Sequence, residues 1–315
     1  MVMPITSAQT VAQIQSYPQL TAACAHLFMG EGCADTTIDQ FCRNNPSWVK
    51  EDMLFGLNRL LEVADAEEAY VHPLWPGESG AKEKISLIHF PVSGEAPFVL
   101  VCAGGAYCTV ASMVEAFPIA AKLNELGYHA FVLEYRSGKN ARFPAPMEDL
   151  RQAILYIQQN AQMLHVKPDD FAVCGMSAGG HLVATLAAKS MQDFYAAIPM
   201  PAALFLAYPV VTMGKYPHLL TRGTLLGQDP DEAIVEKLSI EKQIHKHSPP
   251  VFLWQCREDA VVPFPNSLML DGALEQNGVR HCFQIFEGNA HGWALGTGTQ
   301  AEGWLEEAVR FWQTK

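Results

Sequence analysis

The sequence predicts an α/β fold with a mainly parallel central sheet that is covered by helices on both faces. From residue 70 onward, short apolar runs typical of buried strands alternate with segments of helical periodicity. Glycine or proline separates most of these runs. Strands that are joined through helices pair in parallel, and both faces of the resulting sheet must then be covered.

Residues 1–70 show only helical patterns, and we expect a helical N-terminal extension there. Ser7 can cap a helix over 8–15, and residues 21–29 are apolar and rich in alanine. Thr36 or Thr37 can start a helix through Cys42, and Pro46 and Ser47 can start another that leads into 54–63. None of these segments has catalytic spacing. A lid, a dimer interface and a simple packing extension are all compatible with this pattern.

Residues 71–315 are expected to form the catalytic domain. Its predicted strands are 85–90, 98–103, 129–135, 171–176, 203–208, 251–256 and 280–286, and its predicted helices are 113–126, 146–159, a segment after residue 177, 267–276 and 301–313. The connection 211–246 is too long for a simple loop, so we expect a small cap insertion there. Tyr216, His218 and Leu226 could line this cap or serve only in packing.

Composition excludes several classes of protein. The net charge of -12 argues against nucleic acid and anionic membranes as partners. No run approaches the roughly twenty apolar residues of a membrane span, and no signal peptide is evident, so a cytoplasmic location is expected. The eight cysteines lack any Cys-x-x-Cys pair, which favours free thiols over a metal or redox site.

Ser177 stands in the pattern Gly175-Met176-Ser177-Ala178-Gly179, between an apolar strand and a helix rich in alanine and leucine. This spacing and context are typical of a nucleophile elbow, a tight turn that exposes a serine hydroxyl. The two glycines allow the backbone to double back where a Cβ would collide. Ser177 is therefore the candidate nucleophile.

A serine hydroxyl needs a base and a group that orients this base. Asp259 follows the strand 251–256, and His291 follows the strand 280–286, so both should reach the same sheet edge as Ser177. Glu258 competes with Asp259, but the following Val-Val-Pro favours Asp259 as the inward carboxylate. His181, four residues into the helix, is interpreted as a structural histidine.

Donors for an oxyanion should come from a small-residue turn after an earlier strand. The run Ala103-Gly104-Gly105-Ala106-Tyr107 follows such a strand. We expect the amides of Gly105, Ala106 and Ala178 to form the oxyanion hole.

These motifs recur in order with several others: residues 133–136, residues 143–146 with Asp149, residues 208–210, residues 249–254, and Val262-Pro263 after Asp259. In this arrangement the chain from about residue 70 to its end resembles α/β-hydrolases of the esterase/lipase kind. The likeness is greatest to the bacterial acetyl esterases and acetyl-xylan-esterase-like carbohydrate esterases. Two positions depart from the family pattern, because Ala106 replaces a glycine and Ala103 replaces an imidazole or proline. Arg136 and Asp149 match family positions that suggest a structural ion pair.

The resemblance implies a serine esterase for short-chain acyl esters, with acetylated sugars as a candidate substrate. It also implies Ser177, Asp259 and His291 as the triad and no metal or organic cofactor. Tyr107, Tyr216 and Trp293 are the side chains expected to contact substrate, and a homo-oligomer is compatible with the sequence. A peptidase of the same fold stays open, with Glu232 and Glu236 as a conceivable anchor for an amino terminus. So does a binding protein without catalytic activity, although all three triad positions are filled.

Overall fold

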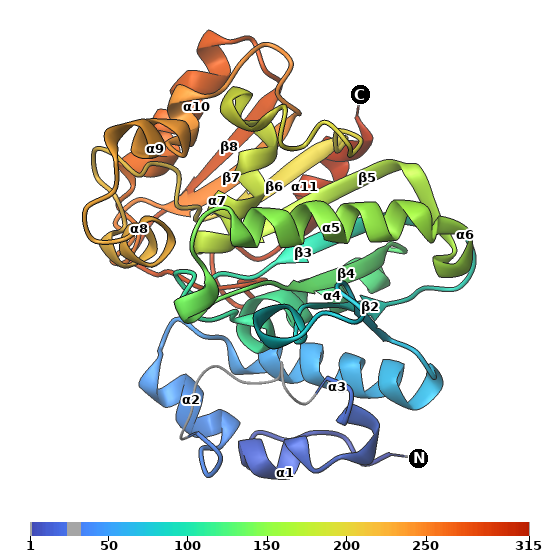
Figure 1. Cartoon of the computed structure of the whole chain (residues 1–315). Helices are drawn as coiled ribbons and strands as arrows, with labels where there is room; N and C mark the ends of the chain where they lie inside the picture. The colour runs from blue at the N-terminus through green and yellow to red at the C-terminus, as the bar shows by residue number, and fades with distance from the viewer. Residues whose placement is uncertain (1, 24–32, 315) are drawn as a thin grey trace.

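A computed structural model describes residues 2–23 and 33–314 of the chain. Its centre is an eight-stranded sheet in the order β1-β2-β4-β3-β5-β6-β7-β8 (Figure 1). The strands are β1 (Val71–Pro73), β2 (Ser86–Phe90), β3 (Ala96–Cys102), β4 (His129–Glu134), β5 (Val166–Met176), β6 (Ala203–Ala207), β7 (Val251–Cys256) and β8 (His281–Phe286).

The pairing confirms the predicted mainly parallel sheet. From β4 to β8 every neighbouring pair is parallel, whereas β1 and β2 run antiparallel at one edge. Two strands differ from the sequence prediction. β1 was not predicted, because it has only three residues and no apolar run. β5 was predicted to begin at residue 171 but begins at Val166, because the polar stretch Lys167–Asp170 interrupts its apolar pattern.

Helices cover both faces of the sheet, as predicted (Figure 1). Alternate residues of β3 point to opposite faces: Leu100 belongs to the hydrophobic core that includes α5 and α10, while Val101 belongs to the core that includes α3, α4 and α11. The helices of the main domain are α4 (Phe117–Glu125), α5 (Ala145–Gln159), α6 (Ala161–Leu164), α7 (Ser177–Ala184), α10 (Pro265–Gln276) and α11 (Trp304–Gln313). Within residues 2–23 and 33–314, no helix is both long and apolar enough to cross a membrane.

The N-terminal extension is helical, with α1 (Val11–Gln15), α2 (Ile38–Asn44) and α3 (Lys50–Ala66). The prediction that Ser7 caps the first helix was wrong, because Thr10 accepts the hydrogen bond from the amide of Gln13 and the Gln13 side chain bonds back to Thr10. Thr37 caps α2 in the same way. Of the predicted segment 21–29, residues 21–23 form a turn and the rest lies outside the described residues.

The extension shares a core with the main domain through the contact between α3 and α4. Gly56 is in α3, and a Cβ added there would lie 2.5 Å from the backbone nitrogen of Pro118, at the start of α4. The two helices approach this closely only because Gly56 has no side chain. This contact orients the chain that leads into α3, including the connection from α2.

The segment between β6 and β7 holds α8 (Leu219–Leu226) and α9 (Glu232–Lys237). Arg142 anchors α8 by donating to the carbonyl oxygens of Gly223 and Thr224. Arg136 donates from Nε to both carboxylate oxygens of the buried Asp149, at 2.9 and 3.1 Å, so the predicted ion pair is confirmed.

Candidate active site

Ser177 stands where β5 ends and α7 begins, in a left-handed conformation with φ of +53°. The neighbouring glycines explain why this turn forms here. A Cβ on Gly175 would lie 2.4 Å from the carbonyl oxygen of Gly179, and one on Gly179 would lie 2.2 Å from that of Cys102. The turn therefore tolerates only glycine at both positions, and it presents Ser177 at the carboxyl edge of the sheet.

Ser177, His291 and Asp259 form one continuous hydrogen-bond chain. The Ser177 Oγ lies 2.9 Å from His291 Nε2, and His291 Nδ1 lies 2.8 Å from Asp259 Oδ2. Because an ionised carboxylate only accepts, the proton of the neutral imidazole is on Nδ1, and Nε2 is left to accept from the serine hydroxyl. The arrangement can therefore transfer a proton from Ser177 to His291.

The loop after β7 orients the Asp259 carboxylate. Its Oδ1 accepts hydrogen bonds from the amides of Val261 and Val262, at 2.8 and 2.9 Å, and its Oδ2 also accepts from the Gln255 side chain at 3.1 Å. With His291 included, the buried Asp259 carboxylate thus accepts hydrogen bonds from four donors. The competing Glu258 is exposed and does not take this place.

Two of the three predicted amide donors, Gly105 and Ala106, lie in the loop after β3. Gly105 and Ala106 both have positive φ, and among the described residues neither amide donates a hydrogen bond. Ala178 is in the first turn of α7, where amides have no partner within the helix. These three amides are available to an oxygen that carries developing negative charge.

A pocket of about 580 Å³ opens beside Ser177 and His291. This volume falls in the range typical of small-molecule sites. Its lining comes from the turn after β3, the start of the π-helical segment before α4, the insertion, and the connection between α2 and α3. The residues involved are Asn44, Asn45, Pro46, Ser47, Trp48, Gly105, Ala106, Cys108, Thr109, Ala111, Val114, Glu115, Ser177, His218, Leu220, Val261, His291 and Gly292.

None of the three aromatic residues expected to contact substrate lines this pocket. Tyr107 is fully buried, Trp293 packs on Trp254 at a ring distance of 6.4 Å, and Tyr216 is exposed elsewhere with Lys215 over its ring. The structure therefore does not bring these three side chains into the pocket, because the direction of each side chain depends on packing. Of the cap candidates, His218 lines the pocket, whereas Leu226 packs on the core.

Tyr107 instead connects the loop after β3 to helix α7. Its hydroxyl donates to Nδ1 of the buried His181 at 3.0 Å, and His181 Nε2 donates to the carbonyl oxygen of Leu238 at 2.9 Å. Burial lowers the pKa of His181 to about 4. His181 is thus a neutral structural histidine, as predicted, and it joins three segments around the site.

Glu115 is a buried carboxylate at the pocket that was not among the residues predicted from the sequence. Its Oε2 accepts from the Gly104 amide at 2.6 Å, and its Oε1 accepts from the Tyr208 hydroxyl at 3.1 Å. The ring of Tyr208 contacts His291, with centroids 4.6 Å apart. Burial raises the pKa of Glu115, while the Gly104 amide, His291 and Tyr208 lower it. A single acidic residue in an otherwise apolar run, 113–121, was the signal that could have identified it.

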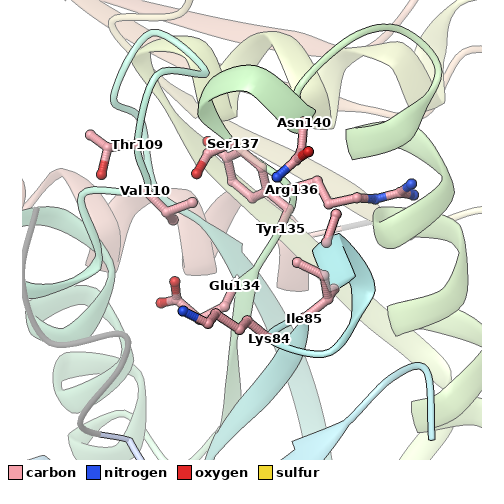
Figure 2. Close-up of a pocket in the computed structure, with 10 residues that line it drawn as sticks. Lys84, Ile85, Thr109, Val110, Glu134, Tyr135, Arg136, Ser137 and Asn140 are labelled. Carbon is pink, nitrogen blue, oxygen red and sulfur yellow. The ribbon is translucent and has the colours of Figure 1, made fainter. Parts of the chain in front are cut away.

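A second pocket lies behind the loop after β3 and contains none of the triad residues (Figure 2). Ser112 donates a hydrogen bond to Glu134 there, and burial raises the pKa of Glu134 to about 8. The guanidinium of Arg136 points toward α5, consistent with its bonds to Asp149. At about 190 Å³ this pocket is smaller than typical ligand sites, so the larger pocket at Ser177 is the candidate active site.

No metal or redox centre is formed by the described residues. In residues 2–23 and 33–314, no group of three or more His, Cys, Asp or Glu side chains is arranged to hold a metal ion. None of the seven cysteines in those ranges is part of a disulfide. The eighth, Cys24, lies outside the described residues.

The family model BD-FAE matches residues 88–200 of the chain. Endo-1,4-beta-xylanase B of Butyrivibrio fibrisolvens is 33% identical over 215 residues, which are 65% of this chain and 34% of that protein. An acetylxylan esterase of Xylanibacter ruminicola is 26% identical over 247 residues, 77% of this chain and 50% of that protein. The chain thus spans between a third and a half of the length of these curated relatives.

Solved structures resemble the chain over nearly their whole length. An acetyl ester-xyloside bifunctional hydrolase from Caldicellulosiruptor lactoaceticus matches with a TM-score of 0.70 and 28% identity, over 78% of this chain and 95% of that one. The carboxylesterase Cest-2923 from Lactobacillus plantarum matches with a TM-score of 0.61 and 25% identity, over 73% and 91%.

Proposed function

The chain belongs to the α/β-hydrolase superfamily, and from this premise we propose that it is a serine esterase for short-chain acyl esters. The observation that carries the proposal is the continuous hydrogen-bond chain from Ser177 through His291 to Asp259 at the edge of an open pocket. It supplies a nucleophile, a base and a group that orients the base.

In the proposed reaction, Ser177 Oγ attacks the ester carbonyl carbon while its proton passes to His291 Nε2. The carbonyl oxygen becomes an oxyanion, and the amides of Gly105, Ala106 and Ala178 donate hydrogen bonds to it. Asp259 stabilises the imidazolium that forms and keeps its Nδ1 proton in place. The amide of Ala106 can donate as a glycine amide would, so the departure from the family pattern is compatible with this role.

The bond from carbon to the alcohol oxygen then breaks, and His291 Nε2 returns the proton to that oxygen. An acyl group remains on Ser177 as an ester. Water repeats the attack with His291 again as base, which releases the carboxylic acid and restores the serine. Each cycle consumes one water and uses only the side chains and backbone amides named.

An acetylated carbohydrate is the proposed substrate class. The similarity to an acetylxylan esterase and to an acetyl ester-xyloside hydrolase supports this choice. We further propose that α8 and the following insertion act as a small cap, because His218 and Leu220 line the pocket from that side.

The peptidase alternative lacks support from the geometry. Glu232 and Glu236 lie on α9 and do not line the pocket, and Glu236 forms an ion pair with Lys242. Within residues 2–23 and 33–314, therefore, no pair of acidic side chains lines the pocket to bind a substrate amino terminus. A binding protein without activity would not need the complete Ser-His-Asp arrangement.

The test is a series of nitrophenyl esters from acetate to octanoate, assayed with the wild type and with Ser177→Ala. We expect kcat/KM to be greatest for the shortest acyl chains and kcat to fall by about 10⁴-fold or more in Ser177→Ala. Ser79→Ala, which changes an exposed serine outside the pocket, serves as the matched control. Full activity of Ser177→Ala, or faster turnover of amino-acyl anilides than of acetate esters, would overturn the proposal.

A further inference from the structure

The N-terminal extension contributes part of the pocket wall next to the triad. Residues 44–48, which connect α2 to α3, line the same pocket as Ser177 and His291. In Figure 1 the connection between α2 and α3 lies on the same side of the molecule as α8. The extension is thus more than a packing element, because it faces whatever binds at Ser177.

Within this connection, Trp48 lies beside Gly292, the residue after the catalytic histidine. A Cβ added to Gly292, the residue after His291, would lie 3.4 Å from Nε1 of Trp48 and 3.6 Å from its Cδ1. The nitrogen-bearing edge of the indole therefore lies against the backbone that carries His291. Among the described residues, the Nε1 proton of Trp48 has no hydrogen-bond partner.

The connection is also held in shape before any ligand binds. The Trp48 amide donates to the carbonyl oxygen of Asn45 at 2.9 Å, and Asn45 Nδ2 donates to that of Phe41 at 3.1 Å. The ring of Phe41 packs behind the indole, with centroids 6.3 Å apart. Residues that are already ordered lose little entropy when they bind a ligand.

Trp48 lies where it can contact the alcohol part of a bound ester. His291 must reach the oxygen of the departing alcohol to protonate it, so the alcohol lies on the His291 side of Ser177. Trp48 borders that side through Gly292. A volume of about 580 Å³ also leaves ample room for an alcohol much larger than a short acyl chain.

The chemistry of this wall matches a sugar ring. A pyranose has an apolar C–H face and a rim of hydroxyl groups, and an indole offers a flat apolar surface with one polar N–H. The side chain of Asn44 and the Oδ1 of Asn45 add polar groups that have no partner among the described residues. A plain alkyl alcohol would leave these polar groups unused.

We infer that Trp48, with Asn44 and Asn45, forms a subsite for a pyranosyl alcohol, an inference that rests on the proposed esterase function. The subsite comes from the N-terminal extension, so it selects the substrate without taking part in the acyl transfer.

The test compares two acetate esters, methyl 3-O-acetyl-β-xylopyranoside and ethyl acetate, by release of acid at constant pH. In Trp48→Ala the ratio of kcat/KM for the sugar ester to that for ethyl acetate should fall by about tenfold or more, through KM for the sugar ester. Trp48→Phe should retain more of the ratio. Phe55→Ala is the control, because it removes an aromatic ring of α3 in the same extension, outside the pocket, and should leave the ratio unchanged.

An unchanged ratio in Trp48→Ala would overturn the subsite, even if both rates fell together. That result would leave the esterase proposal intact, provided that the wild type hydrolyses ethyl acetate and Ser177→Ala does not. If the wild type hydrolyses neither these acetates nor nitrophenyl acetate, the proposed function itself fails, and the subsite with it.

Discussion

His181→Gln offers a direct measurement of how a buried neutral histidine near Ser177 links stability to pH. His181 is fully buried in α7, where it accepts from Tyr107 and donates to the carbonyl oxygen of Leu238. Burial lowers its pKa in the folded protein to about 4. In the unfolded chain the imidazole is solvated and titrates at its ordinary value of about 6.5.

The sign and size of the effect follow from these two values. As the pH falls below about 6.5, the unfolded chain binds a proton at His181 that the folded protein does not, so the wild type loses stability. At pH 5.0 the loss is about 1.36 × (6.5 − 5.0), or about 2 kcal/mol, relative to pH 7.5. Because pH 5.0 lies above the folded pKa of about 4, the unfolded value dominates this figure.

The assay is urea denaturation of the wild type and of His181→Gln at pH 7.5 and pH 5.0. Glutamine cannot titrate, so the destabilisation caused by the substitution should be smaller at pH 5.0 than at pH 7.5 by about 2 kcal/mol. The packing cost appears at both pH values and cancels. Leu182→Ala, a packing change at the next position of α7, should cost the same at both. An equal cost of His181→Gln at the two pH values would refute the reasoning.

Two further predictions concern the walls of the active site. In Glu115→Gln an amide –NH₂ replaces one of the two accepting oxygens, so the Gly104 amide or the Tyr208 hydroxyl loses its acceptor. We expect kcat for nitrophenyl acetate to fall by about tenfold to a hundredfold, with little change in KM. An unaltered kcat would contradict the role of Glu115 in positioning these two groups. In Gly179→Ala the added Cβ would meet the backbone of Cys102 at 2.2 Å, and the free energy of unfolding should fall by about 3 kcal/mol or more. Gly272→Ala in α10 is the control, because no atom outside the helix backbone lies within 4 Å of the new Cβ. It should stabilise the protein by about 0.5–1 kcal/mol. Similar effects of both substitutions would contradict the steric argument.

Much of the fold could be predicted because its signals are local. A buried strand must be apolar over several consecutive residues, and a helix must repeat its apolar positions, whatever the chain does elsewhere. The strand 251–256 was therefore predicted with its observed bounds, whereas the three-residue β1, too short to carry such a pattern, was missed. Helix ends were less certain, as Thr10 rather than Ser7 shows, because neighbouring residues compete for the same cap.

The sequence by itself determined which residues could serve as nucleophile, acid and base, since Ser177, Asp259 and His291 each follow a recognisable strand and parallel strands end at one sheet edge. Only the tertiary structure decided what surrounds them. Tyr107 and Trp293 pack inward, while Glu115 and Trp48, which no motif marks, line the pocket. The physical reason is that the direction of a side chain depends on contacts between residues that are far apart in the chain. The position of residues 44–48 beside the pocket depends on such contacts too, and the contact between α3 and α4 is one of them.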